Sequence, residues 1–300
     1  MKRWILLILL GLTTSIPALA HSGEPLKPHD LWTAWEWDPG IVICLLLTGW
    51  LYVRGIRRTT LRRKYEIVAY LLGWIVLVIA LVSPVHPLGE ALFSVHMAQH
   101  GMLMLVAAPI LVIGRPLVPF LFALPIRWRK ALGSFGKTET ISRAWRILTA
   151  PMFAWCVHAA ALWVWHIPAL YGKTLESDII HTMQHLSFLI SSLLFWWALV
   201  HGREGRLGYG AGVIYLFTTA IHTSVLGALL TVAQTTWYPV YSARTVAWGL
   251  TPLEDQQLAG LIMWVPGGII YLAAGLLMFK LWLNESERVR PWQRVQNDIL

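Results

Sequence analysis

The sequence has little charge and almost no cysteine. Only 13% of its 300 residues are Asp, Glu, Lys or Arg, whereas 57% are hydrophobic and 18 are tryptophan. A soluble domain carries about 25% charged residues, so this composition argues against that class and predicts a polytopic membrane protein. Cys44 and Cys156 lie in separate apolar runs without CxxC or CxxxC spacing. Neither thiol redox chemistry nor a cysteine copper site is therefore indicated.

The sequence also lacks a long basic arm. Its formal net charge of +9 could indicate nucleic acid, but the Lys and Arg residues stand in groups between apolar runs. We therefore expect no nucleic acid partner and interpret these groups as signals of membrane topology.

The first twenty residues have the pattern of a secretory signal peptide. Two basic residues precede a short apolar stretch at 4–12, and the motif ALA at 18–20 has the small-x-small spacing of a cleavage site. The stretch is too short to cross a bilayer, which takes about 20 apolar residues. We predict a signal peptide over 1–20 and one membrane domain over 21–300.

Seven apolar runs have lengths that suit membrane-spanning helices. They lie near residues 40–54, 65–84, 93–113, 150–170, 181–201, 210–234 and 256–282. The sequence therefore predicts an all-α, polytopic membrane protein with seven transmembrane helices in the lipid bilayer.

The distribution of Lys and Arg between the runs predicts how the chain crosses the membrane. The connections 54–64, 114–149 and 201–210 and the tail after residue 279 contain six, seven, two and four of them. The alternate segments of the mature chain contain three in total. Because cytoplasmic loops carry the excess of positive charge, the N-terminus should lie outside and the C-terminus inside.

Two histidine pairs with the same spacing lie at the outer ends of the third and fifth runs. His96 and His100 frame the motif HMAQH, and His181 and His185 frame HTMQH. Positions i and i+4 of a helix share one face, so each pair can act as a clamp with two nitrogens. Both runs are predicted to enter the membrane in the same sense, which places the clamps at one depth. His166, near the outer end of the fourth run, reaches this depth as well.

The histidines taken together indicate a functional site more strongly than any one of them does. A single buried histidine is more simply explained as a helix cap or as a hydrogen-bonding residue between helices. Five ionisable residues at one depth of a membrane are costly and typical of a functional site. Neutral imidazole is the commonest metal ligand, and Met104, one turn below His100, adds a soft thioether.

The neighbours of the histidines narrow the choice of metal. A zinc protease helix of the HExxH type has a glutamate after its first histidine, and Met97 and Thr182 occupy those positions. Calcium and magnesium prefer oxygen ligands, for which Glu254 and Asp255 are the nearest candidates. Histidine mixed with methionine on the outer side favours copper, although imidazole also suits zinc, iron or haem.

Two other functions remain open on these residues. Four histidines on two helices can also provide axial ligands in a haem-binding redox protein, and a b-type haem needs no CxxCH motif. His158 and His222 lie deeper in the fourth and sixth runs. They extend a polar track inward that would suit a copper or proton permease. The sequence has no recognisable nucleophile or general base constellation, so we do not expect an enzyme.

Three stretches resemble the CtaG family of membrane-integral cytochrome c oxidase assembly factors, which occur in bacterial membranes. They are HMAQHGMLMLVAAPILVIGRP (96–116), WHIPALYGKTLESDIIHTMQHLSFLISSLLFWW (165–197) and DQQLAGLIMWVPG (255–267). The resemblance covers most of residues 30–285. It implies about seven spans, a role in the maturation of haem–copper oxidases, and location in the bacterial cytoplasmic (inner) membrane.

The resemblance also implies which residues form the site. By motif position they are His96, His100, His166, His181, His185 and Asp255. With Met104 they make up the predicted metal site, with copper as the expected metal and haem as the alternative. The expected protein is a non-enzymatic factor that holds copper on the extracytoplasmic side and supports its delivery to cytochrome c oxidase subunits.

Overall fold

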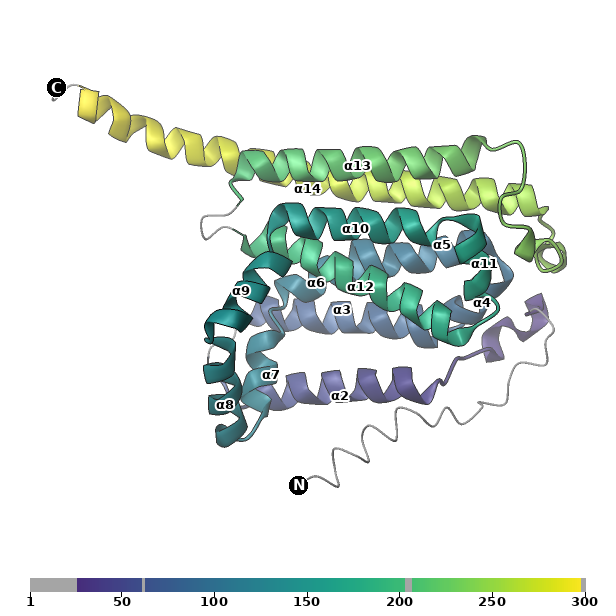
Figure 1. Ribbon diagram of the computed structural model, residues 1–300, viewed down its shortest axis with the longest axis horizontal. Helices are drawn as coiled ribbons and strands as arrows, with labels where there is room; N and C mark the ends of the chain where they lie inside the picture. The colour runs from purple at the N-terminus through teal and green to yellow at the C-terminus, as the bar shows by residue number, and fades with distance from the viewer. Residues whose placement is uncertain (1–25, 61–62, 203–206, 298–300) are drawn as a thin grey trace.

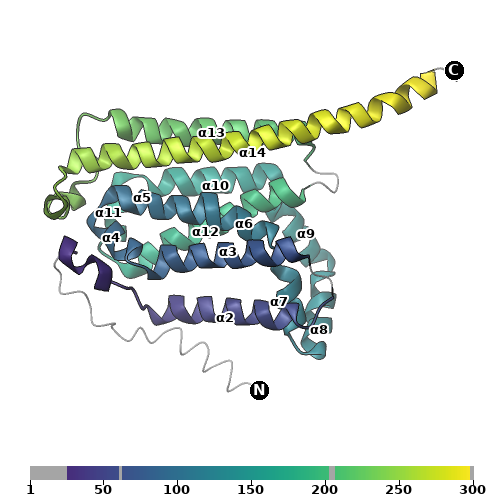
Figure 2. The same ribbon diagram turned by 180° about the vertical axis from the view of Figure 1, so that it is seen from behind.

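The computed structural model describes residues 26–60, 63–202 and 207–297, with side chains up to residue 287. The predicted signal peptide over 1–20 lies outside the described residues. All regular structure in these segments is helical, which confirms the all-α prediction. Figure 1 and Figure 2 show the long helices side by side in one elongated bundle.

Six continuous helical runs are long and apolar enough to cross a membrane within the described residues. They are α2 (Pro39–Ile56), α3 (Lys64–Val82), the run of α5 (Phe93–Gly101), η2 (Met102–Ala107) and α6 (Ala108–Ile113), α12 (Asp178–His201), α13 (Tyr209–Val232) and α14 (Pro252–Asn297). Each corresponds to a predicted span. The protein is therefore a multi-pass membrane protein.

The fourth predicted span, 150–170, is divided in the structure. α10 (Pro151–Trp165) contains 15 residues, a length of about 22 Å at 1.5 Å per residue. It is long enough to span only together with α9 (Glu139–Leu148), from which it is bent by 58°. Pro151 explains the break, because proline disfavours a helical conformation in the residue before it. The count of seven is reached when this bent pair forms one span.

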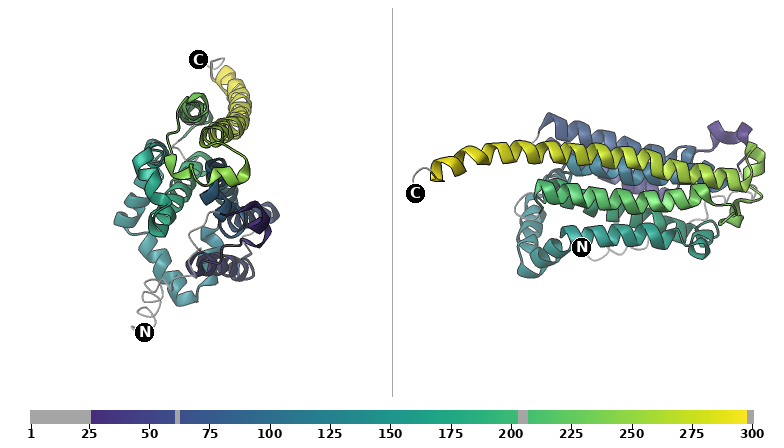
Figure 3. Two further views of the ribbon diagram at one scale, coloured as in Figure 1. Left: turned by 90° about the vertical axis from the view of Figure 1, so that its right-hand side faces the viewer. Right: turned by 90° about the horizontal axis from the view of Figure 1, so that it is seen from above.

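Shorter helices lie at both ends of the bundle (Figure 1), and Figure 3 shows the same arrangement from two further sides. One end carries η1 (Pro28–Thr33), α4 (Val85–Ala91), α11 (Pro168–Thr174), η3 (Pro239–Tyr241) and η4 (Thr245–Trp248). The other end carries α7 (Leu117–Ala123), α8 (Ile126–Gly136) and α9. The second end also holds the predicted cytoplasmic connections that the structure describes. Which side of the membrane it faces stays a prediction.

Local capping explains where two of the spans begin. The Asp38 carboxylate accepts a hydrogen bond of 2.8 Å from the Ile41 backbone N–H, and Pro39 occupies the first helical position. At the start of α14, the Thr251 N–H donates to the Glu254 carboxylate (2.8 Å) and the Glu254 N–H donates to the Thr251 hydroxyl (3.2 Å). This reciprocal capping box satisfies donors that the first helical turn would otherwise leave free.

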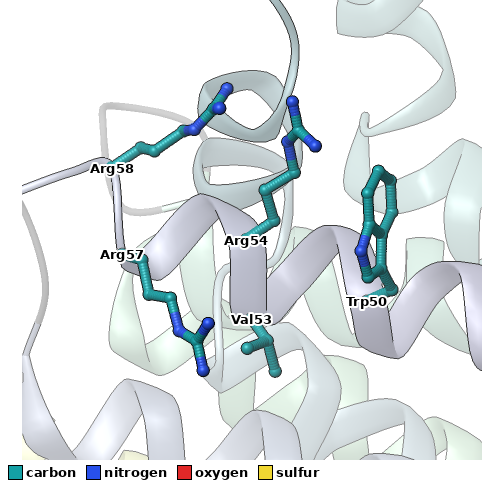
Figure 4. A pocket seen from close by; sticks show the side chains of 5 residues that line it. All are labelled: Trp50, Val53, Arg54, Arg57 and Arg58. Atoms are coloured by element: carbon teal, nitrogen blue, oxygen red, sulfur yellow. The ribbon is translucent and has the colours of Figure 1, made fainter.

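A basic pocket of about 260 Å³ lies near the end of α2 (Figure 4). It is lined by Trp50, Val53, Arg54, Arg57 and Arg58. The Arg54 Nε–H donates to the Ala123 carbonyl at 2.9 Å, and its guanidinium carbon lies 4.9 Å from the centre of the Trp50 ring. These contacts fasten α2 to the end of α7 and anchor part of the first basic connection.

α13 and α14 form a closely packed pair along one side of the bundle (Figure 1). A Cβ atom on Gly260 would lie 2.5 Å from the Gly227 carbonyl oxygen, and one on Gly227 would lie 2.8 Å from the Cβ of Trp264. Small residues permit this approach, as they do in other pairs of membrane helices. Because α14 also packs against α5, this pair helps to position the third span.

A π-helical turn, η2, interrupts the third span directly after the first histidine motif. Such wide turns leave backbone groups outside the regular hydrogen-bond pattern and are frequent at functional sites. Here the Trp196 indole N–H on α12 donates to the Met104 carbonyl at 2.9 Å. The wide turn is thus bonded to the second histidine-bearing helix.

The two spans that carry the histidine pairs are the most enclosed. Over the most apolar 18 residues, 56% of the third span and 50% of α12 are buried, against 17% of α2 and 11% of α14. Polar residues on the third span and α12 can therefore face protein and avoid lipid.

Candidate metal centre

The four paired histidines come together between α5 and α12. His96 and His100 project from α5, His181 and His185 project from α12, and none is more than 7% exposed. The ring centres of His96 and His185 lie 5.5 Å apart, and those of His100 and His185 lie 5.2 Å apart. The structure thus brings the two predicted clamps face to face.

Two overlapping sets of three imidazoles could each hold one ion. The first set is His96, His100 and His185, and the second is His86, His181 and His185. Within each set, the ligand nitrogens lie within 4.8 Å of one another. We call these five residues the histidine cluster.

The nitrogens of the α5 pair already have a spacing that suits coordination. The Nε2 atoms of His96 and His100 are 2.9 Å apart. If two nitrogens each bind one ion at about 2 Å and the angle between the two bonds at the ion is about 90°, the nitrogens are about 2.9 Å apart. Both Nε2 atoms can therefore bind the same ion without a large rearrangement.

Several nitrogens of the histidine cluster are buried and have no hydrogen-bond partner among the described residues. They are His100 Nδ1, His181 Nε2 and His185 Nε2. Buried polar atoms normally have partners, and an unsatisfied one costs about 1–3 kcal/mol. A bound ion would supply the partner that His181 Nε2 or His185 Nε2 lacks, so the donor set fits a metal.

The sequence prediction did not include His86 among the ligands. It lies on α4, and its ring stacks on that of His181 with centres 5.0 Å apart and an interplanar angle of 11°. The Gln99 side-chain amide nitrogen is 2.9 Å from His86 Nδ1 and 2.7 Å from the Ala80 carbonyl oxygen. The sequence shows His86 in a nearby loop, but nothing in it indicates that α4 folds back against α5.

The glutamine before the second histidine of each pair contacts a histidine of another element. Gln99 on α5 holds His86 on α4, and the Gln184 amide oxygen on α12 lies 3.3 Å from His96 Nε2 on α5. Outer contacts of this kind fix the orientation of metal-binding imidazoles. The two glutamines therefore tie together the three helices that carry the histidine cluster.

His166 lies close to the histidine cluster but outside both sets of three. At the C-terminal cap of α10, its Nδ1 is 2.6 Å from the Leu162 carbonyl oxygen and its Nε2 is 3.3 Å from the Met97 sulfur. Because a carbonyl oxygen only accepts, Nδ1 carries the proton of the first contact, and the lone pair of the neutral ring is at Nε2. Its role as a ligand stays a prediction.

Met104 packs in an apolar cluster with Leu162, Phe188 and Leu226. The Phe188 ring lies 4.6 Å from the ring of His100, so this apolar cluster adjoins the histidines. The structure therefore places Met104 next to the predicted site, among hydrophobic side chains. Its role as a metal ligand stays a prediction.

Asp255 is bonded to the first residues of α5. Its carboxylate accepts hydrogen bonds from the backbone N–H groups of Phe93 (2.6 Å) and Ser94 (3.1 Å). A carboxylate at a helix N-terminus satisfies free donors and complements the helix dipole. Asp255 thus fastens α14 to the start of a histidine-bearing helix, and a direct role in metal binding stays a prediction.

Replacing Asp255 with asparagine is expected to lower the free energy of unfolding by about 2 kcal/mol, because charge-assisted hydrogen bonds to buried groups are lost. The capacity of the histidine cluster to bind a metal ion should stay unchanged if the carboxylate acts through α5 alone. Thermal unfolding of the purified protein in detergent and metal analysis would measure both effects. Glu254→Gln, at the exposed neighbouring position, is the control. Loss of metal binding without loss of stability would instead make Asp255 a ligand.

A buried group of aromatic residues adjoins His96. The Tyr241 hydroxyl oxygen is 3.4 Å from His96 Nδ1, 2.8 Å from the Tyr171 hydroxyl oxygen and 3.0 Å from the Gly89 carbonyl oxygen. Burial raises the pKa of Tyr241 above its ordinary value, so its phenol keeps its proton and can donate one hydrogen bond. Tyr241 lies on η3 and Tyr171 lies on α11. Both are far from His96 along the chain, so the sequence did not indicate that they adjoin it.

His158 and His222, the deeper histidines, have neighbours outside the histidine cluster. His158 contacts the Ser192 hydroxyl oxygen at 3.4 Å from Nδ1 and the Tyr271 hydroxyl oxygen at 3.5 Å from Nε2. The ring of His222 lies 5.3 Å from that of Trp155. The contacts of His158 are those of a polar residue packed between helices.

The fold and the site together define a class of protein: a multi-pass helical membrane protein with a buried imidazole cluster near one end of its bundle. The family model for the cytochrome c oxidase caa3 assembly factor, Caa3_CtaG, matches residues 50–285. The chain belongs to this family, which confirms the resemblance seen in its motifs.

Three curated relatives come from mycobacteria. The chain is 26% identical over 269 residues to uncharacterized proteins of Mycobacterium bovis and Mycobacterium tuberculosis, and 25% identical over 285 residues to one of Mycobacterium leprae. The matches cover 86% to 89% of this chain but 40% to 42% of the relatives. The chain thus spans about two-fifths of the length of these relatives. No solved structure matches it.

Proposed function

We propose that this protein is a non-enzymatic assembly factor that binds copper at its histidine cluster and supports delivery of the ion to cytochrome c oxidase. Membership of the caa3 assembly-factor family supports the assembly role. The observation that carries the copper part is the meeting of imidazoles from α4, α5 and α12, all buried except that of His86, in two sets that could each hold a metal ion. The proposal places the protein in the bacterial cytoplasmic membrane, with the cluster on the extracytoplasmic side and oxidase subunits as partners.

The donor atoms favour copper over harder metals. Both sets consist of imidazoles, and neither includes a carboxylate. Calcium and magnesium take oxygen ligands, whereas imidazole and thioether suit copper. The sulfur of Met97, which contacts His166 at 3.3 Å, adds a soft donor beside the cluster.

The packing of the rings favours a bare ion over haem. Axial histidines of a haem stand on opposite faces of the macrocycle, which lies between them. Here the rings of His96 and His100 on α5 have centres 5.5 and 5.2 Å from that of His185 on α12, so the rings of the two helices pack against each other without a macrocycle between them. A Soret band in the purified protein would nevertheless support the haem alternative and contradict copper binding.

In this proposal copper is cargo, and its transfer proceeds by exchange of ligands. Two short helices at the same end of the bundle contact the helices that carry the histidine pairs: α4 contacts α5, and α11 contacts α12. Delivery then requires that some ligands be replaced by those of the receiving protein while others still hold the ion. Residues near the end of the bundle are best placed for that exchange.

Metal analysis of the purified protein tests the proposal. The wild type should contain copper after loading, and the His100→Ala/His185→Ala double variant should lose it, because this change removes ligands from both sets. A matched His29→Ala/His201→Ala variant removes two histidines away from the cluster and should keep the metal. Unchanged copper in the first variant would exclude these ligands.

An assay of oxidase activity in cells that carry the same variants tests the assembly role separately. Cells with the His100→Ala/His185→Ala variant should have less active cytochrome c oxidase than cells with the matched control. Copper flux into proteoliposomes that depends on His222 would instead support the permease alternative.

A further inference from the structure

We propose that the histidine cluster gives one copper ion two adjacent positions that share His185. An outer position is formed with His86 and His181, and an inner position is formed with His96 and His100. This inference rests on the proposed copper binding. It describes how the ion reaches and leaves the buried ligands.

The two sets of three overlap at one residue. His185 is the single residue common to both, and within each set the ligand nitrogens lie within 4.8 Å of one another. The rings of His181 and His96, one from each set, have centres 5.1 Å apart. An ion that exchanges two ligands and keeps His185 can therefore pass from one set to the other over a short distance.

The two positions differ in their access to solvent. The inner ligands His96 and His100 are 0% and 4% exposed, and the hydroxyl of Tyr241 lies beside His96. His86, in contrast, is only partly buried and lies on the short helix α4 at the end of the bundle. Open metal sites exchange ligands readily, whereas closed sites retain their ion. The outer set is thus suited to exchange, and the inner set to retention.

A hydrogen bond from Gln99 occupies one nitrogen of His86. A neutral imidazole has one lone pair, and the Gln99 amide N–H donates to that of His86 at Nδ1. The same Gln99 amide is anchored by the Ala80 carbonyl. An ion that binds His86 at Nδ1 must displace this hydrogen bond, and release of the ion restores it.

Charge limits the cluster to one ion at a time. Neither set includes a carboxylate that would offset a second positive charge. Two unit charges about 4 Å apart repel each other by about 4 kcal/mol at an effective dielectric constant near 20. The two sets are therefore alternative positions of one ion and not a two-metal centre.

The kinetics of copper transfer test this arrangement. Purified full-length protein in detergent is loaded with Cu(I), and its transfer to bathocuproine disulfonate is followed by stopped-flow absorbance. The wild type and His86→Ala should each bind one copper per chain, but His86→Ala should release it at least about tenfold more slowly, because the exchange position is lost. His100→Ala should release copper faster than the wild type, because its ion stays in the outer position.

Two further variants make the test specific. His86→Gln keeps a polar side chain next to Gln99 and should release copper as slowly as His86→Ala, which separates the loss of a ligand from a packing defect. His29→Ala, at an exposed histidine of η1, should behave as the wild type.

Three results would overturn the two-position arrangement: an unchanged release rate in both His86 variants, equal losses of copper in His86→Ala and His100→Ala, or two coppers per wild-type chain. A wild-type protein that binds no copper would instead refute the proposed function itself.

Discussion

Replacing His185 with alanine is expected to lower the affinity for copper about 100-fold, more than replacement of any other single histidine. Removal of a residue that only supports a metal ligand already costs about 10–100-fold, so loss of a direct ligand should lie at or above the top of that range. His185 belongs to both sets of three imidazoles, whereas His181 belongs to one. Competition with a Cu(I) chelator of known affinity would measure the effect.

The comparison with His181→Ala makes this prediction specific. His181 is on the same helix, one turn away, and its ring centre lies 4.4 Å from that of His185. If the shared position of His185 matters, His181→Ala should weaken copper binding clearly less. Equal affinities for the two variants would show that the imidazoles of α12 act as interchangeable ligands.

Replacing Gly260 with leucine is expected to destabilise the protein by about 3 kcal/mol or more, since overfilling a packed contact forces backbones apart. A Cβ at this position would lie 2.5 Å from the Gly227 carbonyl oxygen and 2.6 Å from the Thr231 nitrogen. Neither is a flexible side-chain end, so α13 and α14 must separate. Thermal unfolding in detergent would measure the loss of stability.

Gly268→Leu is the matched control for this prediction. Gly268 lies on the same helix, and a Cβ there would meet no atom within 4 Å. The substitution should therefore change stability by less than about 0.5 kcal/mol, as is usual for an open surface position. Similar destabilisation by both variants would mean that leucine disturbs α14 itself, independently of the close contact with α13.

The positions of the spans were largely predictable from the sequence, because membrane helices are specified by local hydropathy. The predicted run 93–113 coincides with the third span, and α12 differs from its predicted start by three residues. The fourth span was the exception. The hydropathy of the sequence does not indicate the 58° bend before Pro151, where one helix ends and the next begins.

The meeting of the two histidine pairs was also predictable, because it needs only helical periodicity and a consistent direction of the spans. The remaining parts of the site depend on a turn between two consecutive helices and on a contact between distant segments. His86 reaches the cluster because α4 folds back on α5, and Asp255 caps α5 from 161 and 162 residues away along the chain. A single sequence carries no local signal for either contact.

The wide turn after His100 has a mechanical consequence for the third span. In a continuous α-helix, every side chain keeps a fixed angle to those one turn away, so rotating one means rotating all. η2 breaks that rule between α5 and α6, and the Trp196 indole steadies the break by bonding the Met104 carbonyl. The wider turn therefore offsets the face of α5 that carries the imidazoles from the face that α6 packs, so the two halves of the third span need not present the same side to their neighbours.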